Sequence, residues 1–448
     1  MKITDELQIA TSFVICYTVR DAVKKWQRNS KEFEGRFYMK KNATSIVFTG
    51  DIGFDRYMDR KWEDEQLLSE ELLDFFHSAD HVCASVEGAL IDAVDDGSRG
   101  IFFHSMNPEA TSMYKKIGAD LWAIGNNHSM DAGAEGVIST RKIAEELGCL
   151  AFGAGLNEVE ASEPIYLDEA GGIGMFGVSY MAECIPATAT EPGIFRWDDL
   201  DYIERRIKEI KEKCRWCIVV SHGGEEFTSL PSPYTRERYL KFLELGADVV
   251  VGGHPHVTEN YELFDNGKAI FYSLGNFIFD TDYQRVHLYT DEGVLLKLKF
   301  TEESMDFEAI GTKIIRGPER IVKGPLPDVF TNIPAEEYEL LSPLAAKAFV
   351  LEDMRKMVYL ERNDEEKPFA AAFPEELNGY FYSADLPAVW KTYFYDNIPE
   401  ADGYFEKAHM DFSVIVPFSD KADEGLWKQS KLEKVKEYIL RQFEGIKK

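Results

Sequence analysis

A chain of 448 residues with 45% hydrophobic residues can bury a large core, and its length suggests two or three domains, or one large domain with an appendage. The formal net charge of −29 argues against nucleic acids and anionic membranes as partners, because both bind basic surfaces. We therefore expect an anionic small molecule or polymer to bind only where a local positive centre, such as a divalent cation, offsets this charge.

The first 20 residues lack a basic segment, and their apolar stretch at 10–19 contains threonines and is too short to span a bilayer. We therefore expect no export signal, no membrane anchor and a cytoplasmic location. The six cysteines are then expected to be reduced thiols. Cys214 and Cys217 form a C-x-x-C pair, but Cys217 opens an apolar strand instead of preceding a helix, which favours core thiols over redox chemistry.

From residue 45 onward, short β-branched runs alternate with amphipathic stretches, which is typical of βαβ units around a mostly parallel sheet. Predicted strands cover residues 45–49, 82–86, 121–124, 173–179, 217–221, 249–251 and 269–273. Predicted helices cover residues 65–76, 108–117, 134–147, 200–213 and 233–245. After residue 265, closely spaced strands at 293–300 and 306–315 suggest antiparallel hairpins that finish a second sheet.

A connector with proline and glycine at 316–334 ends this region. We expect an N-terminal extension at 1–42, a main domain at 43–330 and a mostly helical, aromatic-rich region at 331–448. The aromatic side chains between residues 380 and 405 could stack on a sugar or peptide ligand, although packing of a helical appendage against the main domain is favoured.

Polar side chains able to bind metal follow five of the predicted strands, at the edge where open α/β sheets bind ligands. They are Asp51, Glu87, the run Asn126, Asn127 and His128 with Asp131 nearby, His222, and the pair His254 and His256. Four of the nine histidines thus stand at strand ends beside glycines that permit tight turns. A lone histidine is more often a structural core residue, but this conjunction favours a shared metal site.

The mixture of carboxylate, amide and imidazole groups suits one or two divalent ions, Mn²⁺, Fe or Zn²⁺. Two ions about 3.5 to 4 Å apart could bridge a nucleophilic hydroxide. The bridging ligand must be a carboxylate, since only that group offers two anionic oxygens to two cations, and Glu87 is the candidate.

Six motifs occur in a fixed order along the chain: F-T-G-D at 48–51, V-E-G at 86–88, N-N-H-S-M-D at 126–131, H-G-G-E-E-F at 222–227, G-G-H-P-H-V at 252–257 and Y-S-L-G-N-F at 272–277. Together they resemble the CapA-type poly-gamma-glutamate capsule-synthesis family within the calcineurin-like metallophosphoesterases. The resemblance covers roughly residues 43–315 and does not extend to the C-terminal third.

The resemblance implies a four-layer α/β/β/α sandwich of the metallo-dependent phosphatase type, with a mostly helical C-terminal appendage. It also implies metal ligands, namely Asp51, Glu87, Asn127, His222, His254 and His256. His128, held by Asp131, would face the substrate and protonate a leaving group, because a neighbouring carboxylate favours the protonated imidazole. The expected substrate contacts are Arg56, Glu226 and Asn276, although a surface salt bridge is an equal alternative for Arg56.

Two positions depart from the pattern of related proteins. Gly53 stands where ordinary metallophosphoesterases carry a histidine, so one metal position loses a ligand and is expected to bind more weakly. Gly223 stands where the family usually carries tryptophan, which is expected to open the pocket.

These features predict a metal-dependent hydrolase in which a metal-bound hydroxide cleaves a phosphoester or related bond. The alternative is a non-hydrolytic or accessory protein in the biosynthesis or export of poly-gamma-glutamate or capsule polymer. A module that binds metal only for its structure is disfavoured, because it would need neither His128 nor Asp131.

Overall fold

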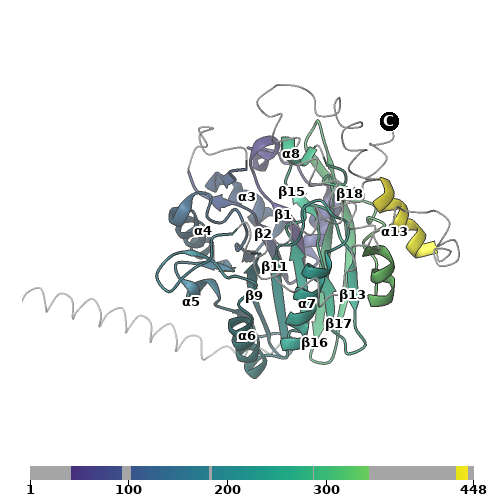
Figure 1. Cartoon of the computed structure of the whole chain (residues 1–448). Coiled ribbons are helices and arrows are strands. Elements are labelled where there is room, and N and C mark those ends of the chain that lie inside the picture. Colours follow the sequence, from purple (N-terminus) through teal and green to yellow (C-terminus); the bar gives the residue numbers. More distant parts are fainter. Residues whose placement is uncertain (1–41, 93–101, 181–183, 286, 343–429, 442–448) are drawn as a thin grey trace, which may run out of the picture. The chain divides into compact units, whose positions relative to one another are not determined.

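The structure of the protein is a computed structural model that describes residues 42–92, 102–180, 184–285, 287–342 and 430–441. These residues form a mixed α/β structure with one eight-stranded and one six-stranded sheet (Figure 1). The N-terminal extension up to residue 41 and the aromatic stretch at 380–405 lie outside the described residues.

The eight-stranded sheet is parallel on one side of its first strand and antiparallel on the other. Its path runs β18 (Arg320–Gly324), β17 (Met305–Ile315), β16 (Glu292–Thr301), β1 (Ala43–Ile52), β2 (His81–Val86), β5 (Leu121–Ala123) and β6 (Leu150–Phe152). The strands β1, β2, β5 and β6 are parallel, whereas β16, β17 and β18 are antiparallel to their neighbours. The short strand β15 (Asn276–Ile278) pairs in parallel with the end of β1.

The six-stranded sheet has a parallel centre and an antiparallel strand at each edge. Its order is β13 (Tyr261–Leu263), β14 (Ala269–Phe271), β12 (Val249–Gly253), β11 (Trp216–His222), β9 (Ile173–Ser179) and β8 (Ile165–Leu167). Two small pairs complete the strands, β3 (Ala89–Leu90) with β4 (Ser105–Met106) and β7 (Ala154–Gly155) with β10 (Gly193–Ile194).

The α-helices are α2 (Glu70–His77), α3 (Thr111–Ile117), α4 (Gly133–Leu147), α5 (Glu158–Ala161), α6 (Leu200–Lys213), α7 (Pro233–Leu245), α8 (Asp282–Arg285) and α13 (Ser430–Arg441). Three short 3₁₀ helices are η1 (Arg56–Met58), η2 (Lys61–Glu63) and η3 (Pro108–Ala110). No helix within these described ranges combines the length and apolar character needed to cross a membrane.

Successive residues of the central strands enter different apolar clusters, because side chains alternate between the faces of a strand. In β1, Val47 packs with α2, α3 and α4, whereas Ile46 and Phe48 belong to a cluster that also contains Ile218 of β11. On the other face of β11, Val219 packs with α6 and α7. Both sheets are thus buried on both faces, which explains why their strands are nearly continuous apolar runs in the sequence.

The seven predicted strands between residues 45 and 273 are confirmed within three residues of their ends, and the predicted helices at 200–213 and 233–245 coincide with α6 and α7. Each of these helices has a side-chain N-cap, since Asp199 accepts from the amide of Tyr202 and Ser232 from that of Thr235. The cap fixes where each of these two helices begins.

The prediction that the helix begins at residue 65 was wrong, because α2 begins at Glu70. Leu68 instead forms a bridge with Ile321 of β18, and the amide of Ser69 donates to the carbonyl of Ile321 over 3.0 Å. The predicted connector at 316–334 therefore contains a strand, β18, that was missed.

The assignment of the late hairpins to a second sheet was also wrong. After β14 the chain crosses back, and β16 pairs with β1 from Ala43↔Thr301 to Phe48↔Leu296. The strands β15 to β18 thus extend the first sheet. Alternating apolar residues predict a strand but do not say which sheet it joins, since pairing depends on distant partners.

The helix α13 packs on residues that follow β18 and on residues from earlier loops of the chain. Its Leu432, Val435 and Ile439 share a buried cluster with Leu230 and Val329, and Tyr438 stacks on Tyr289 with ring centroids 3.8 Å apart. Helix α13 is therefore part of the folded core in the described part of the C-terminal region.

We predict that Leu298→Ala lowers the free energy of unfolding by about 2 to 5 kcal/mol, because the side chain is fully buried between the two sheets and its loss leaves a cavity. The matched control is Leu263→Ala, a strand leucine that is 43% exposed, which should change stability by less than about 0.5 kcal/mol. Denaturant unfolding of both variants measures the difference, and equal losses would contradict the packing described here.

Candidate metal and proton-transfer site

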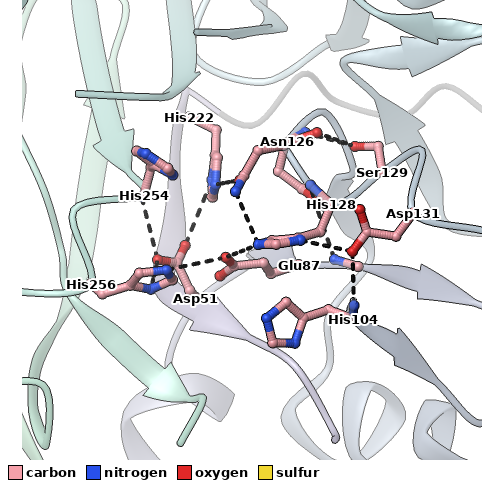
Figure 2. A network of polar contacts seen from close by, with 12 residues as sticks. Asp51, Glu87, His104, Asn126, His128, Ser129, Asp131, His222, His254 and His256 are labelled. Atoms are coloured by element: carbon pink, nitrogen blue, oxygen red, sulfur yellow. Dashed lines mark hydrogen bonds and ion pairs between the residues drawn. The ribbon is translucent and has the colours of Figure 1, made fainter. Parts of the chain in front are cut away.

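The predicted site residues converge at the carboxyl ends of parallel strands from both sheets (Figure 2). Asp51 lies at the end of β1 and Glu87 directly after β2, both in the eight-stranded sheet. His222 ends β11, and His254 and His256 follow β12 in the six-stranded sheet. The site thus forms where the ends of the two sheets come together.

Asp51, Glu87 and His256 form the centre of this site. One ligand atom from each lies within 4.8 Å of the others, and all three residues are buried. The Nδ1 atom of His256 is 3.5 Å from Oδ2 of Asp51, and its Nε2 atom is 3.5 Å from Oε1 of Glu87. Two carboxylates and an imidazole at this spacing could hold a divalent metal ion.

Glu87 provides the observation that tests whether a cation fits. Both of its carboxylate oxygens are buried without a hydrogen-bond partner, and the side chain has no exposed surface. Burial and the neighbouring charge of Asp51 raise the pKa of Glu87 well above its ordinary value. Because an unpaired buried carboxylate is costly, these oxygens fit a site that a divalent cation would complete.

Asp51 is the better compensated carboxylate. Its Oδ1 accepts from the hydroxyl of Ser85 over 3.0 Å, and its Oδ2 accepts from the amide of His254 over 3.3 Å. Burial alone would raise its pKa, but the hydrogen bond to His256 and the positive charge of that imidazole outweigh burial and lower the pKa to about 2. Asp51 is therefore an anion at neutral pH.

The turn that carries His254 and His256 has an unusual backbone. Their φ angles are +97° and +57°, in the left-handed region that costs non-glycine residues free energy. The ring of His256 stacks on Phe279, with centroids 4.9 Å apart and planes 8° apart, and its Nδ1 is 3.0 Å from Oδ1 of Asn276. The surroundings therefore hold His256 in an orientation that faces both carboxylates.

Asn276, predicted as a substrate contact, has its side chain committed to other groups. Besides its contact with His256, its Nδ2 donates to Oε1 of Gln284 over 3.2 Å and to the carbonyl of Thr290 over 2.9 Å. These partners favour a role in orienting His256.

His222 and Asn127 lie beside the central group. Nε2 of His222 is 3.0 Å from Oδ1 of Asn127, and its Nδ1 is 3.8 Å from Oδ1 of Asp51. Burial lowers the pKa of His222 well below its ordinary value, which keeps the imidazole neutral as a metal ligand must be. The rings of His222 and His254 are 5.1 Å apart. All six predicted ligands are thus neighbours, although the central three are the closest set.

His128 and Asp131 form the predicted hydrogen-bonded pair. Nδ1 of His128 is 2.8 Å from Oδ2 of Asp131, while its Nε2 is 2.9 Å from Nδ2 of Asn127 and 3.9 Å from Oε1 of Glu87. The expectation of a protonated imidazole was wrong in direction. Burial and the charge of His104 lower the pKa of His128, and they outweigh the opposing effect of Asp131.

Arg56 and Glu226, the other predicted substrate contacts, lie at the margin. The exposed Arg56 donates from its guanidinium to the carbonyl of Phe103 over 3.4 Å, next to His104. Glu226 is half-buried, and its charge acts on both Glu87 and His256. Their roles in binding a substrate remain predictions.

Three residues that the sequence did not single out complete the surroundings: His104, Asp55 and Phe279. The ring of His104 packs against that of His128, its Nδ1 bonds Oδ2 of Asp55, and it also contacts Phe279. Asp55 lies four positions after Asp51, which is the one sequence signal that pointed towards it.

The two unusual glycines have different consequences. A side chain at Gly53 would collide with Phe279, since a Cβ there would lie 2.6 Å from the phenyl ring. No ligand can therefore reach the site from position 53 in this arrangement. The expectation that Gly223 opens the pocket was wrong, because Tyr180 and Trp197 fill that space, with Cβ of Tyr180 only 2.5 Å from where a side chain would begin.

The family model described as bacterial capsule synthesis protein PGA_cap matches residues 45–281, which is more than half of the chain. The chain belongs to this family. The match covers β1 to β15 and every predicted site residue.

Two curated relatives of this PGA_cap chain are CapA proteins. The PGA biosynthesis protein CapA of Bacillus subtilis (strain 168) is 28% identical over 250 residues, which are 54% of this chain and 65% of that protein. The capsule biosynthesis protein CapA of Bacillus anthracis is 31% identical over 189 residues, 40% of this chain and 45% of that protein. The chain therefore spans less than two thirds of the length of these relatives.

Among solved structures, TT1561 of Thermus thermophilus aligns with 59% of this chain and 98% of its own, at 12% identity. Its TM-score of 0.33 is too low to support a conclusion.

We predict that Mn²⁺ binding releases protons and tightens as pH rises. Glu87 raises the pKa of His256 to about 10 against the effect of burial, and the pKa of Glu87 is itself raised, so this pair keeps at least one proton at neutral pH that a cation must expel. Titration calorimetry in buffers with different ionisation enthalpies measures this release. Binding that is independent of pH between roughly 6 and 9, taken as the range about neutrality, would contradict it.

Glu87→Gln should weaken Mn²⁺ binding by at least about a hundredfold, because it removes an anionic ligand at the centre of the site. The matched control is Glu259→Gln, another buried carboxylate that lies outside the central group and should leave the affinity unchanged. Equal effects of the two substitutions would remove Glu87 from the ligand set.

We further predict that dialysed protein retains no more than about one tightly bound metal ion per chain, because Phe279 occupies the space of a ligand at position 53. Elemental analysis after dialysis against metal-free buffer measures this content. Two retained equivalents would show that the second position does not depend on that ligand.

Proposed function

We propose that the chain is a CapA-type metal-dependent hydrolase that cleaves a phosphoester or a related bond. The observation that carries this proposal is the juxtaposition of a buried carboxylate that accepts no hydrogen bond with a hydrogen-bonded imidazole. Oε1 of Glu87 lies 3.9 Å from Nε2 of His128, whose opposite nitrogen is held by Asp131. A cation-binding group and a proton-transfer pair thus share one place, as hydrolytic metal sites require.

Asp51, Glu87 and His256 would hold the cation, with His222, His254 and Asn127 as neighbouring ligands. Their oxygen and nitrogen donors suit Mn²⁺, Fe or Zn²⁺. When bound, such an ion would supply Lewis-acid polarisation of the scissile bond and stabilise developing negative charge.

The chain's own residues supply the proton transfer. Asp131 accepts from Nδ1 of His128 and so leaves Nε2 to exchange a proton. Because the pKa of His128 is lowered, the neutral imidazole can accept a proton and then donate it to a leaving oxygen. Asp131 holds the ring in the same orientation in both steps.

The substrate is proposed to be an anionic small molecule or polymer. The net charge of −29 would repel it everywhere except near a bound cation, which restricts productive binding to the site. We also propose that Arg56 and Glu226 contact it from the margin.

For the architecture we propose the four-layer α/β/β/α sandwich. Three apolar clusters support it: one between the sheets and one between each sheet and its helices. The predicted boundaries at 42/43 and 330/331 remain part of this proposal.

A second candidate is a non-hydrolytic or accessory role in the biosynthesis or export of a capsule polymer such as poly-gamma-glutamate. The names of the two Bacillus relatives favour it, because both are named for capsule or PGA biosynthesis. The similarity covers only part of each relative, so activities that those proteins perform with residues outside the shared region do not carry over to this chain.

We predict Mn²⁺-dependent cleavage of 4-nitrophenyl phosphate, bis(4-nitrophenyl) phosphate or phenyl phosphate. His128→Ala should lower kcat for phenyl phosphate, whose leaving group needs a proton, by about 10²- to 10⁴-fold with Mn²⁺ affinity retained, because it removes the proton-transfer group and no central ligand. His222→Ala should weaken both binding and turnover. The control is His77→Ala, whose ring bonds the carbonyl of Lys116 on the surface and should leave both unchanged.

The two candidate functions separate in the same experiment. Cleavage that does not need a cation, or cleavage of phenyl phosphate that survives His128→Ala unchanged, would contradict the hydrolytic proposal. Binding of poly-gamma-glutamate with no turnover of any ester or gamma-amide would favour the accessory role.

A further inference from the structure

A second imidazole–carboxylate pair, His104 and Asp55, lies directly against His128. Nδ1 of His104 bonds Oδ2 of Asp55, and their side chains are only 6% and 11% exposed. The ring of His104 meets that of His128 edge to face, with centroids 4.3 Å apart and planes 85° apart. Figure 2 shows His104 beside His128 and Asp131. Neither His104 nor Asp55 has a role in the function proposed above.

The local chain is built to bring His104 to this place. His104 directly precedes β4, which pairs in parallel with β3, and β3 follows the Glu87 loop. Gly88 has a φ of +93°, and a Cβ there would lie 2.9 Å from the carbonyl oxygen of His104. The backbones approach so closely that only glycine fits at position 88.

His104 reaches His128 by two routes. Its backbone amide donates to Oδ2 of Asp131 over 2.8 Å, and the same oxygen accepts from Nδ1 of His128 over 2.8 Å. Its ring covers the edge of the His128 imidazole. The amide hydrogen bond holds Asp131, the partner of His128, and the ring contact holds His128 itself.

The ring contact adds to the restraint that the hydrogen bonds supply. The imidazole of His128 can turn only about its Cβ–Cγ bond, and the ring of His104 packs against it where such a rotation would break the contacts with Asp131 and Asn127. Among the described residues, His104 contributes the aromatic ring that packs against it. Asp55 in turn prevents His104 from turning, because it fixes Nδ1.

We propose, on the basis of the hydrolytic function above, that His104, held by Asp55, is a positioning residue that sets the ring orientation of His128 and so keeps its Nδ1–H on Asp131. It acts through His128 and is not assigned a contact with the substrate. Loss of the His104 ring should leave the cation-binding group in place and misalign the imidazole that exchanges the proton.

The first test does not depend on activity. Histidine ring ¹⁵N spectra of the metal-free full chain report the tautomer of His128, which His128→Ala assigns. We expect a single Nδ1–H tautomer in the wild type and mixed or exchange-broadened signals in His104→Leu combined with Asp55→Asn, which leaves no unpaired charge. His104→Phe with Asp55→Asn keeps an aromatic ring and should retain more of the wild-type signal.

The matched control is His81→Leu with Asp120→Asn, because Nδ1 of His81 bonds Oδ2 of Asp120 over 2.7 Å in an equivalent pair outside the site. It should leave the His128 signals unchanged. Unchanged His128 signals in the His104→Leu variant would overturn the positioning role. If that variant does not fold, Asp55→Ala, which frees the His104 ring, is measured with the same expected and overturning results.

The second test uses two leaving groups. If His104 acts through His128, His104→Leu should lower kcat/KM for phenyl phosphate about tenfold more than for 4-nitrophenyl phosphate, whose leaving group needs no proton. In a His128→Ala background the same substitution should have no further effect. Equal losses in both backgrounds would overturn the proposal. A wild type that cleaves neither ester refutes the hydrolytic function, and the spectra still decide the positioning role.

Discussion

The site depends on the burial of two like charges at one place. Asp51 and Glu87 both have no exposed surface, yet Asp51 receives hydrogen bonds while the oxygens of Glu87 receive none. Two carboxylates in such surroundings need a proton or a cation between them. Histidines surround the two carboxylates. A left-handed turn places His254 and His256 beside them, and stacking on Phe279 orients the ring of His256.

Much of the fold could be predicted from the sequence, because its strands are buried on both faces and two of its long helices, α6 and α7, have side-chain caps. Continuous apolar runs marked β9, β11 and β12, and the N-caps of α6 and α7 marked their beginnings. The partner of β16 and the existence of β18 could not be predicted, since both depend on pairing with residues far away in the chain.

The candidate site was predictable to the extent that its residues follow strand ends. Asp51, Glu87 and His256 do so, and the structure brings them together. His104 does not, because it precedes β4, and the pairing of β3 with β4 brings it to Asp55, which lies 49 positions earlier in the chain. The pKa direction of His128 was missed for the same reason, because burial and the neighbour His104 are properties of the folded state.

Both sheets contribute side chains to the central group, so binding of a metal ion there depends on the folded arrangement of both sheets. Asp51 and Glu87 come from the eight-stranded sheet, and His256 follows a strand of the six-stranded sheet. An ion bound by all three would stabilise the folded chain, because it binds the folded state and not the unfolded one. The availability of metal would therefore add to the stability that the apolar cluster between the two sheets already supplies.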